Sequence, residues 1–204
     1  MGFLALDIGT TNWKAVVFSR QCVPVCSAKR PARTMQGQDG LPYYDPRHVW
    51  ESVVEMIAEV GASYPLGELA AVSVTSMGEA VVPMGQDGQP VFPIIPWFDT
   101  RSIEQAGQVR RQVGTQRAFA ITGTEVGAIF SLPKMLWMRA HYPEVFARAH
   151  KWLQMADYVN YQLCGRFVTD PSMACRTLAF DLGRCAWSEE MLAPFGLAPS
   201  LFPQ

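Results

Sequence analysis

Residues 7–14 (DIGTTNWK) lie between two short apolar runs, at 3–6 and 15–18, and they constrain the fold more than any other segment. The pattern predicts a strand, a tight turn and a second strand. The turn brings together one carboxylate, one glycine, two hydroxyl groups and, further on, a lysine. Glycine lets the backbone approach an anion closely, and the N–H groups and hydroxyls of such a turn can cradle phosphate oxygens.

The charged groups of this turn suit a nucleotide. Asp7 can hold Mg2+ through water, because Mg2+ keeps much of its hydration shell, and Lys14 can offset phosphate charge. Two interpretations are open at this point. The segment is either a hairpin for the phosphates of ATP or a plain β-hairpin with a polar turn.

Composition restricts the class of protein. The chain has 204 residues, of which 49% are hydrophobic, so we expect a folded core. A net charge of −1 argues against a nucleic-acid partner and against a polybasic membrane surface. We see no signal-peptide pattern and no stretch as long as a membrane span, and we therefore expect a cytoplasmic protein. The five cysteines are scattered and odd in number, so we expect reduced thiols.

The order of predicted elements indicates a mixed α/β core followed by a helical part. Asp45 and Pro46 form a favoured helix start, and apolar residues recur with helical period over 49–60. The segment 69–75 predicts a buried strand, and no linker separates two independent domains. The other predictions are a strand meander at 3–7, 13–18 and 22–27, a loop at 35–42, a hairpin of 80–84 with 91–95, and helices at 101–113, 132–140, 143–149, 155–163 and 188–193.

A second polar cluster follows the strand at 69–75. Ligands of open α/β sheets bind beyond the carboxyl ends of strands, and a carboxylate there, Glu79, can accept two hydroxyl hydrogen bonds from a polyhydroxy substrate. Trp97 can stack on the C–H surface of a sugar, and Asp99 and Arg101 can act as polar clamps. The alternatives are also open: Trp97 as core filler, Glu79 as a surface turn residue, and Asp99–Arg101 as a solvated pair.

Taken in order along the chain, these segments resemble the N-terminal domain of the FGGY carbohydrate kinases, which include xylulokinase, gluconokinase and glycerol kinase. The resemblance implies the α/β ribonuclease H-like fold of the actin, hexokinase and Hsp70 superfamily, with a mixed sheet, flanking helices and a helical elaboration. The segments that carry it are 4–11 (LALDIGTT), 44–46 (YDP), 72–79 (VSVTSMGE), 93–101 (PIIPWFDTR), 121–124 (ITGT), 133–137 (PKMLW), 156–158 (ADY), 169–174 (TDPSMA) and 180–181 (FD).

The resemblance also implies an activity, which is transfer of the γ-phosphoryl group of ATP, with Mg2+, to a hydroxyl of a sugar, sugar acid or polyol. Asp7 is similar to the Mg2+-proximal aspartate of the family. The residues similar to the first phosphate loop are Gly9, Thr10, Thr11, Asn12 and Lys14. The residues similar to substrate contacts or their neighbours are Met77, Gly78, Glu79, Trp97 and Asp99. Relatives are often dimers, so a homodimer is a further expectation.

Two departures from the family pattern bear on function. Gly78 stands where relatives often carry a side chain that reaches the sugar, which implies a roomier pocket. The catalytic base of the family is an aspartate in a Gly-rich segment, and we expect it, and the second, nucleotide-binding domain, beyond Gln204. We therefore expect residues 1–204 to be an N-terminal domain cut before its C-terminal end and inactive by itself. The alternatives are a non-catalytic sugar-binding or sensor module and another superfamily member, such as a hexokinase-like enzyme or an actin-like ATPase; the segments 97–101 and 133–137 argue against the latter.

Overall fold

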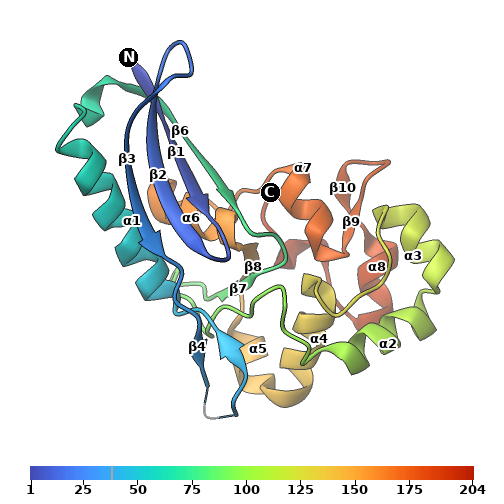
Figure 1. The fold of residues 1–204 in the computed structure, drawn as a ribbon. Coiled ribbons are helices and arrows are strands. Elements are labelled where there is room, and N and C mark those ends of the chain that lie inside the picture. The colour runs from blue at the N-terminus through green and yellow to red at the C-terminus, as the bar shows by residue number, and fades with distance from the viewer. Residues whose placement is uncertain (38) are drawn as a thin grey trace. The chain divides into compact units, whose positions relative to one another are not determined.

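The computed structural model describes residues 1–37 and 39–204, and the chain divides into two compact units. Unit 1 comprises Met1–Met35 and Tyr44–Met77. Unit 2 comprises Gln36–Tyr43 and Gly78–Gln204 (Figure 1). The loop predicted at 35–42 includes residue 38, which lies outside the described residues. On either side of it, β4 (Met35–Gln36) and β5 (Pro42–Tyr43) form a two-stranded sheet.

Unit 1 is built on a four-stranded sheet in the order β3-β2-β1-β6. The first three strands form the predicted antiparallel meander, and β6 pairs with β1 in parallel (Figure 1). The strands are β1 (Gly2–Ile8), β2 (Asn12–Ser19), β3 (Pro24–Pro31) and β6 (Leu69–Ser76). Successive side chains of a strand point to opposite faces, and in β1 and β2 every second one is buried. These buried residues are Leu4, Leu6, Ile8, Trp13, Ala15 and Val17.

Helix α1 (Pro46–Gly61) covers the buried face of this sheet by packing on β2 and β3. It begins as predicted, because the Asp45 carboxylate accepts a hydrogen bond of 2.9 Å from the backbone N–H of Arg47. Its apolar stripe is buried against the sheet. The residues of that stripe are Val49, Val53, Met56 and Val60. A 3-10 turn, η1 (Leu66–Glu68), then leads to β6.

The strand predicted at 69–75 is present as β6, but the prediction that it is buried was wrong. Most of its side chains are exposed, and Val72 is 45% exposed. The reason is its position. β6 is the edge strand of the four-stranded sheet, next to β1, whereas α1 packs mainly on β2 and β3.

Unit 2 contains a short antiparallel pair, β7 (Val81–Met84) and β8 (Lys151–Gln154). The predicted hairpin is confirmed by bridges from Val81 to Ile95 and from Met84 to Pro90. Its second arm is not a regular strand, because prolines at 90, 93 and 96 lack the backbone N–H that a ladder requires. The sequence patterns missed β8, which is only four residues long and lies between two predicted helices.

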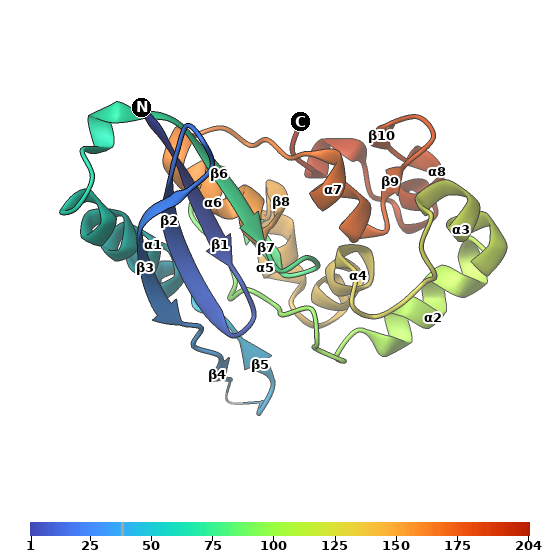
Figure 2. The same cartoon turned by 45° about the horizontal axis from the view of Figure 1, so that its top comes forward.

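The rest of unit 2 is mainly helical, and the five predicted helices are all present. Helix α4 lies at its centre, contacts α2, α5 and η2, and is buried from Ser131 to Met138 (Figure 2). Helix α3 was not predicted, since Gly114 precedes it and no side chain caps it. The elements are α2 (Ile103–Gln112), α3 (Thr115–Thr122), α4 (Ser131–His141), α5 (Pro143–Arg148), α6 (Met155–Cys164), α7 (Pro171–Ala174), η2 (Cys175–Thr177), β9 (Phe180–Asp181), β10 (Ala186–Trp187), α8 (Glu189–Leu192), η3 (Ala193–Phe195) and η4 (Pro199–Leu201).

Two expectations about composition can be compared with this fold. Within residues 1–37 and 39–204, no helix combines the length and the apolar character needed to cross a membrane. All five cysteines are free thiols, as predicted.

Candidate functional site

The turn between β1 and β2 requires glycine at position 9. The backbone N–H of Gly9 donates to the carbonyl oxygen of Asn12 over 3.1 Å. A Cβ atom on Gly9 would lie only 2.9 Å from that same oxygen. The other side of the turn is tied to the residue that follows β3, because Ala32 N–H donates to the Thr11 carbonyl over 3.0 Å. The side chains of Thr10 and Thr11 are exposed at the tip. A tight turn with exposed hydroxyls is therefore present where the sequence predicted a phosphate-binding segment.

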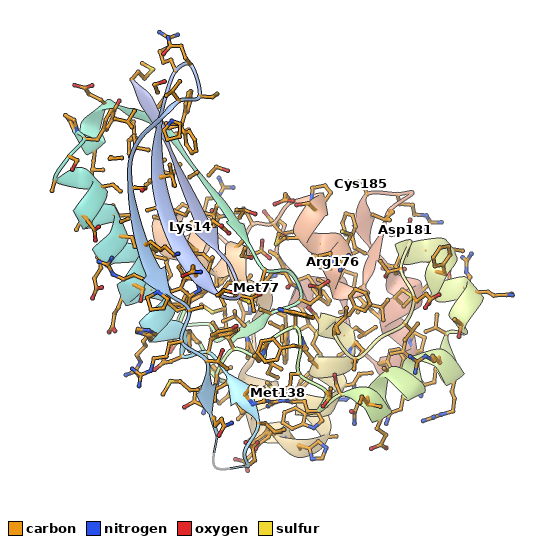
Figure 3. All side chains as sticks on the ribbon, viewed as in Figure 1. Lys14, Met77, Met138, Arg176, Asp181 and Cys185 are labelled. Carbon is orange, nitrogen blue, oxygen red and sulfur yellow. The ribbon has the colours of Figure 1, made fainter. Side chains whose placement is uncertain are left out.

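Asp7 and Lys14 lie side by side across the two strands. They are register partners in the β1–β2 pair, and Asp7 is also opposite Thr75 of β6. Because Leu6 and Ile8 face the core, Asp7 points to the opposite face of the sheet. Its carboxylate lies 3.8 Å from the Lys14 ammonium, and each side chain is about half exposed, at 47% and 48%. Figure 3 labels Lys14 on this sheet. An exposed ion pair of this kind is weak, so both groups can be redirected to a ligand.

The donor set at Asp7 fits one kind of metal. Among residues 1–37 and 39–204, no group of three His, Cys, Asp or Glu side chains is placed to hold an ion. A single half-exposed carboxylate does not make an all-protein cage. It does fit Mg2+, which keeps several waters and needs only one or two carboxylates beside substrate phosphates.

In unit 2, Glu79 has an unusual backbone. Its φ angle is +59°, in the left-handed region that non-glycine residues rarely adopt. Its side chain is buried, and Arg176 Nε donates to Glu79 Oε1 over 2.5 Å while Nη2 of the same arginine contacts the same oxygen. Strained conformations of this type cost about 1–3 kcal/mol and cluster at functional sites. The alternative that Glu79 is a surface turn residue is therefore wrong.

Lys134 of α4 joins the segment of Glu79 to the segment that precedes Trp97. Its fully buried ammonium donates to the carbonyl of Glu79 over 2.6 Å and to the carbonyl of Pro96 over 2.8 Å. Burial lowers the pKa of Lys134 to about 7, although the charges of Asp99 and Glu79 act in the opposite direction. The sequence reasoning missed this role. The available signal was a lysine within the otherwise apolar run 132–138 (LPKMLWM), since a lysine inside a buried helix must find partners.

Asp99 and Arg101 form a buried pair. Arg101 Nε donates to Asp99 Oδ1 over 2.8 Å, and Nη2 donates to Oδ2 over 2.7 Å. Arg101 also donates to the Pro42 carbonyl over 2.9 Å, and its guanidinium lies 4.8 Å from the centre of the Trp137 ring. The alternative of a solvated pair is therefore wrong. Both Asp99 oxygens accept from Arg101, so Asp99 supports the loop that follows Trp97, and direct contact with a substrate stays a prediction.

The remaining predicted residues are divided between the two units. Trp97 is 39% exposed and packs edge-on against Phe98 at 5.7 Å between ring centres, so it is not core filler. Met77 ends unit 1, where its N–H donates to the carbonyl of Ile8 over 3.0 Å. Gly78 begins unit 2. We call these two predicted groups, whose ligands stay predictions, the phosphate half-site and the sugar half-site. The phosphate half-site in unit 1 comprises Asp7, Gly9, Thr10, Thr11, Asn12 and Lys14, and the sugar half-site in unit 2 comprises Gly78, Glu79, Trp97 and Asp99.

Known proteins match this chain over nearly its whole length. The model of the FGGY family of carbohydrate kinases, N-terminal domain, matches residues 3–204. Xylulose kinase of Staphylococcus xylosus is 28% identical over 98% of the chain and 42% of the relative. Gluconokinase of Bacillus licheniformis is 26% identical over 96% of the chain and 38% of the relative. The crystal structure of xylulose kinase from Rhodospirillum rubrum superposes with a TM-score of 0.92 at 26% identity, covering 100% of this chain and 42% of that one.

These matches confirm the predicted ribonuclease H-like α/β fold. The chain spans about two fifths of the length of the curated relatives it matches. Because the family model covers all but the first two residues, the chain belongs to the FGGY family of carbohydrate kinases and corresponds to the family's N-terminal domain.

Proposed function

We propose that the protein containing this chain transfers the γ-phosphoryl group of ATP to a hydroxyl of a sugar, sugar acid or polyol. The family match over residues 3–204 carries this proposal. The curated relatives reported above are named as kinases of xylulose and gluconate. The two half-sites support it independently, since one has groups suited to phosphate and the other has groups suited to hydroxyls. A cytoplasmic location belongs to the same proposal.

The phosphate half-site would bind the nucleotide. The N–H groups of the Gly9 turn, the hydroxyls of Thr10 and Thr11, the Asn12 segment and the Lys14 ammonium would hold phosphate oxygens. Asp7 would hold Mg2+ through water, and the ion would supply neutralisation of the charge on the transferring phosphate. Phosphoryl transfer depends mainly on positioning and charge neutralisation, and the exposed Asp7–Lys14 pair offers one group for each charge.

The sugar half-site would orient the acceptor. Glu79 would accept hydrogen bonds from hydroxyls, and Trp97 would stack on the C–H face of the ring or chain. Lys134 would keep the two segments in place, because its ammonium bonds to the carbonyls of Glu79 and Pro96. Met77 and Asp99 stay predicted substrate residues. The proposal also places two features in sequence after Gln204. These are the general base and the adenine pocket.

Calorimetry of the 204-residue chain tests this assignment. We expect Mg·ATP to bind through its phosphate groups, since the adenine pocket is assigned to sequence after Gln204, and we expect binding of at least one of D-xylulose, gluconate and glycerol. Asp7→Asn is expected to weaken Mg·ATP and leave sugar affinity unchanged, whereas Glu79→Gln is expected to do the reverse. A folded chain that binds none of these ligands would contradict the proposal. Robust ADP release from the chain would contradict a base located after Gln204, and sugar binding without nucleotide binding would favour the sensor module.

A further inference from the structure

Arg176 lies directly against Gly78, although the two are far apart in sequence. A Cβ atom built on Gly78 would be 3.3 Å from Arg176 Cγ and 3.6 Å from Arg176 Nε. The absence of a side chain at Gly78 therefore leaves room for the stem of Arg176. Figure 3 labels this arginine at η2. A guanidinium reaches the sugar half-site from an element that the sequence analysis did not connect with it.

The position of Arg176 is well determined by its surroundings. Its guanidinium lies 5.5 Å from the centre of the Phe130 ring and contacts Oε1 of Glu79. The turn that carries it is held by the next residue, because Thr177 Oγ1 donates to the Ala174 carbonyl over 2.7 Å. The arginine side chain is 38% exposed, whereas that of Glu79 is 9% exposed. The guanidinium is therefore the solvent-facing member of the pair.

The pair has donors and an acceptor left for a ligand. A guanidinium carries five N–H donors in a planar fork, more than the contacts of Nε and Nη2 with Glu79 require. Both of these contacts go to Oε1, and a carboxylate has about four acceptor sites on its two oxygens, so Glu79 keeps acceptor capacity for a ligand. An adjacent donor and acceptor match two neighbouring hydroxyl groups, of which one accepts from arginine and the other donates to glutamate. An added carboxylate would instead meet the negative charge of Glu79.

We propose that Arg176 is a specificity-determining residue of the sugar half-site, where it donates to one hydroxyl of a vicinal diol while Glu79 accepts from the neighbouring hydroxyl. This inference rests on the proposed function, because it assigns the substrate chemistry of the same half-site. It adds a residue that none of the family segments quoted above contains, and it favours neutral polyols and ketoses over sugar acids.

The test compares wild-type and variant proteins in their affinities for a parent ligand and for analogues that lack one hydroxyl. The affinities are measured by calorimetry on the 204-residue chain. The probes are glycerol with propane-1,2-diol and propane-1,3-diol, and D-xylulose with its monodeoxy analogues. A lost hydrogen bond to a charged group corresponds to about a tenfold or larger loss of affinity. We expect the wild-type chain to discriminate by about this factor against the analogue that lacks the contacted hydroxyl. Arg176→Met should bind the parent about tenfold more weakly and should no longer discriminate. Arg176→Lys should retain part of the discrimination.

Gly78→Ala provides a second variant that keeps every charge. Its new Cβ would press on Arg176 Cγ at 3.3 Å, so the guanidinium must shift and discrimination should fall without loss of the Arg176 side chain. Arg184→Met is the matched control, since Arg184 is 86% exposed and pairs with Asp181 only at 3.8 Å.

Four results would overturn the inference. An equal loss of affinity for parent and analogues would mean that Arg176 only holds Glu79 in place. A loss confined to gluconate, added as a third parent, would mean that Arg176 pairs with a carboxylate. If the folded wild-type chain bound none of the probes, the proposed function would fail as well. If Arg176→Met bound the parent ligands and still discriminated against the analogues as the wild type does, only the role of Arg176 would fail.

Discussion

Replacement of Lys134 by methionine should change how the stability of unit 2 depends on pH. Methionine has a similar length and no charge, so Lys134→Met removes the amino group and its N–H donors without opening a large cavity. Two buried carbonyls, of Glu79 and Pro96, then lose their donor. A buried polar group without a partner costs about 1–3 kcal/mol, so the two carbonyls together should cost roughly 2–6 kcal/mol at pH 9.

The pH dependence follows from the lowered pKa of Lys134. Burial lowers this pKa from 10.5 to about 7, so between these values the unfolded chain binds a proton that the folded chain does not. The free energy of unfolding of the wild-type chain therefore increases as pH rises from 7 to 10.5. This stabilisation by Lys134 is complete above pH 10.5, and it is lost as pH falls through 7. One proton corresponds to about 1.4 kcal/mol per pH unit. The destabilisation by Lys134→Met should thus grow by up to about 3 kcal/mol between pH 7 and pH 9.

Urea unfolding followed by tryptophan fluorescence between pH 6 and pH 9 measures this effect. Lys29→Met is the matched control, because it removes an exposed ammonium from β3. A difference between wild type and Lys134→Met that stays constant with pH, or that shrinks as pH rises, would refute the reasoning about the buried amine.

Three further predictions concern other parts of the chain. Burial raises the pKa of Asp157 from 3.8 to about 7, so Asp157 stabilises the fold below pH 3.8 and this stabilisation is lost as pH rises through 7. Asp157→Asn should remove this decline of the unfolding free energy, measured by urea unfolding. Gly9→Ala should lower the melting temperature and abolish Mg·ATP binding in calorimetry, because its Cβ would lie 2.9 Å from the Asn12 carbonyl oxygen. Asp45→Ala should cost about 1 kcal/mol in thermal unfolding through loss of the α1 cap, and Asp45→Asn should retain most of that stability.

Local sequence chemistry accounts for the elements that were predicted correctly. The β1–β2 hairpin follows from two alternating apolar strands and a polar turn, and the start of α1 follows from Asp45 and Pro46. Both signals lie within a few residues of the structure they determine. The two elements that the sequence patterns missed also have local reasons. Helix α3 lacks a side-chain cap, and β8 is too short for a periodic pattern.

Burial was predicted poorly, because it depends on which elements pack together. The apolar composition of 69–75 suggested a covered strand, yet β6 became an exposed edge. The polar pair of Asp99 and Arg101 suggested solvent, yet it is enclosed with the Pro42 carbonyl and the Trp137 ring. The type of a side chain sets the free-energy cost of burying it. Whether it is buried depends on packing against residues that are distant in sequence.

The sequence by itself determined the family, through the resemblance of its segments, and the order of most elements, because turn chemistry, capping and apolar periodicity act over short stretches of chain. The residues of both half-sites stay predictions from the same sequence. The partners of those residues depend on the tertiary structure. Arg176 reaches Glu79 across 97 positions, and Lys134 reaches the Glu79 carbonyl across 55. These contacts arise only when η2 and α4 pack against the segment that follows β6. The physical reason is that a buried charge takes whatever partner the packed elements bring within hydrogen-bond distance, and no local pattern encodes that distance.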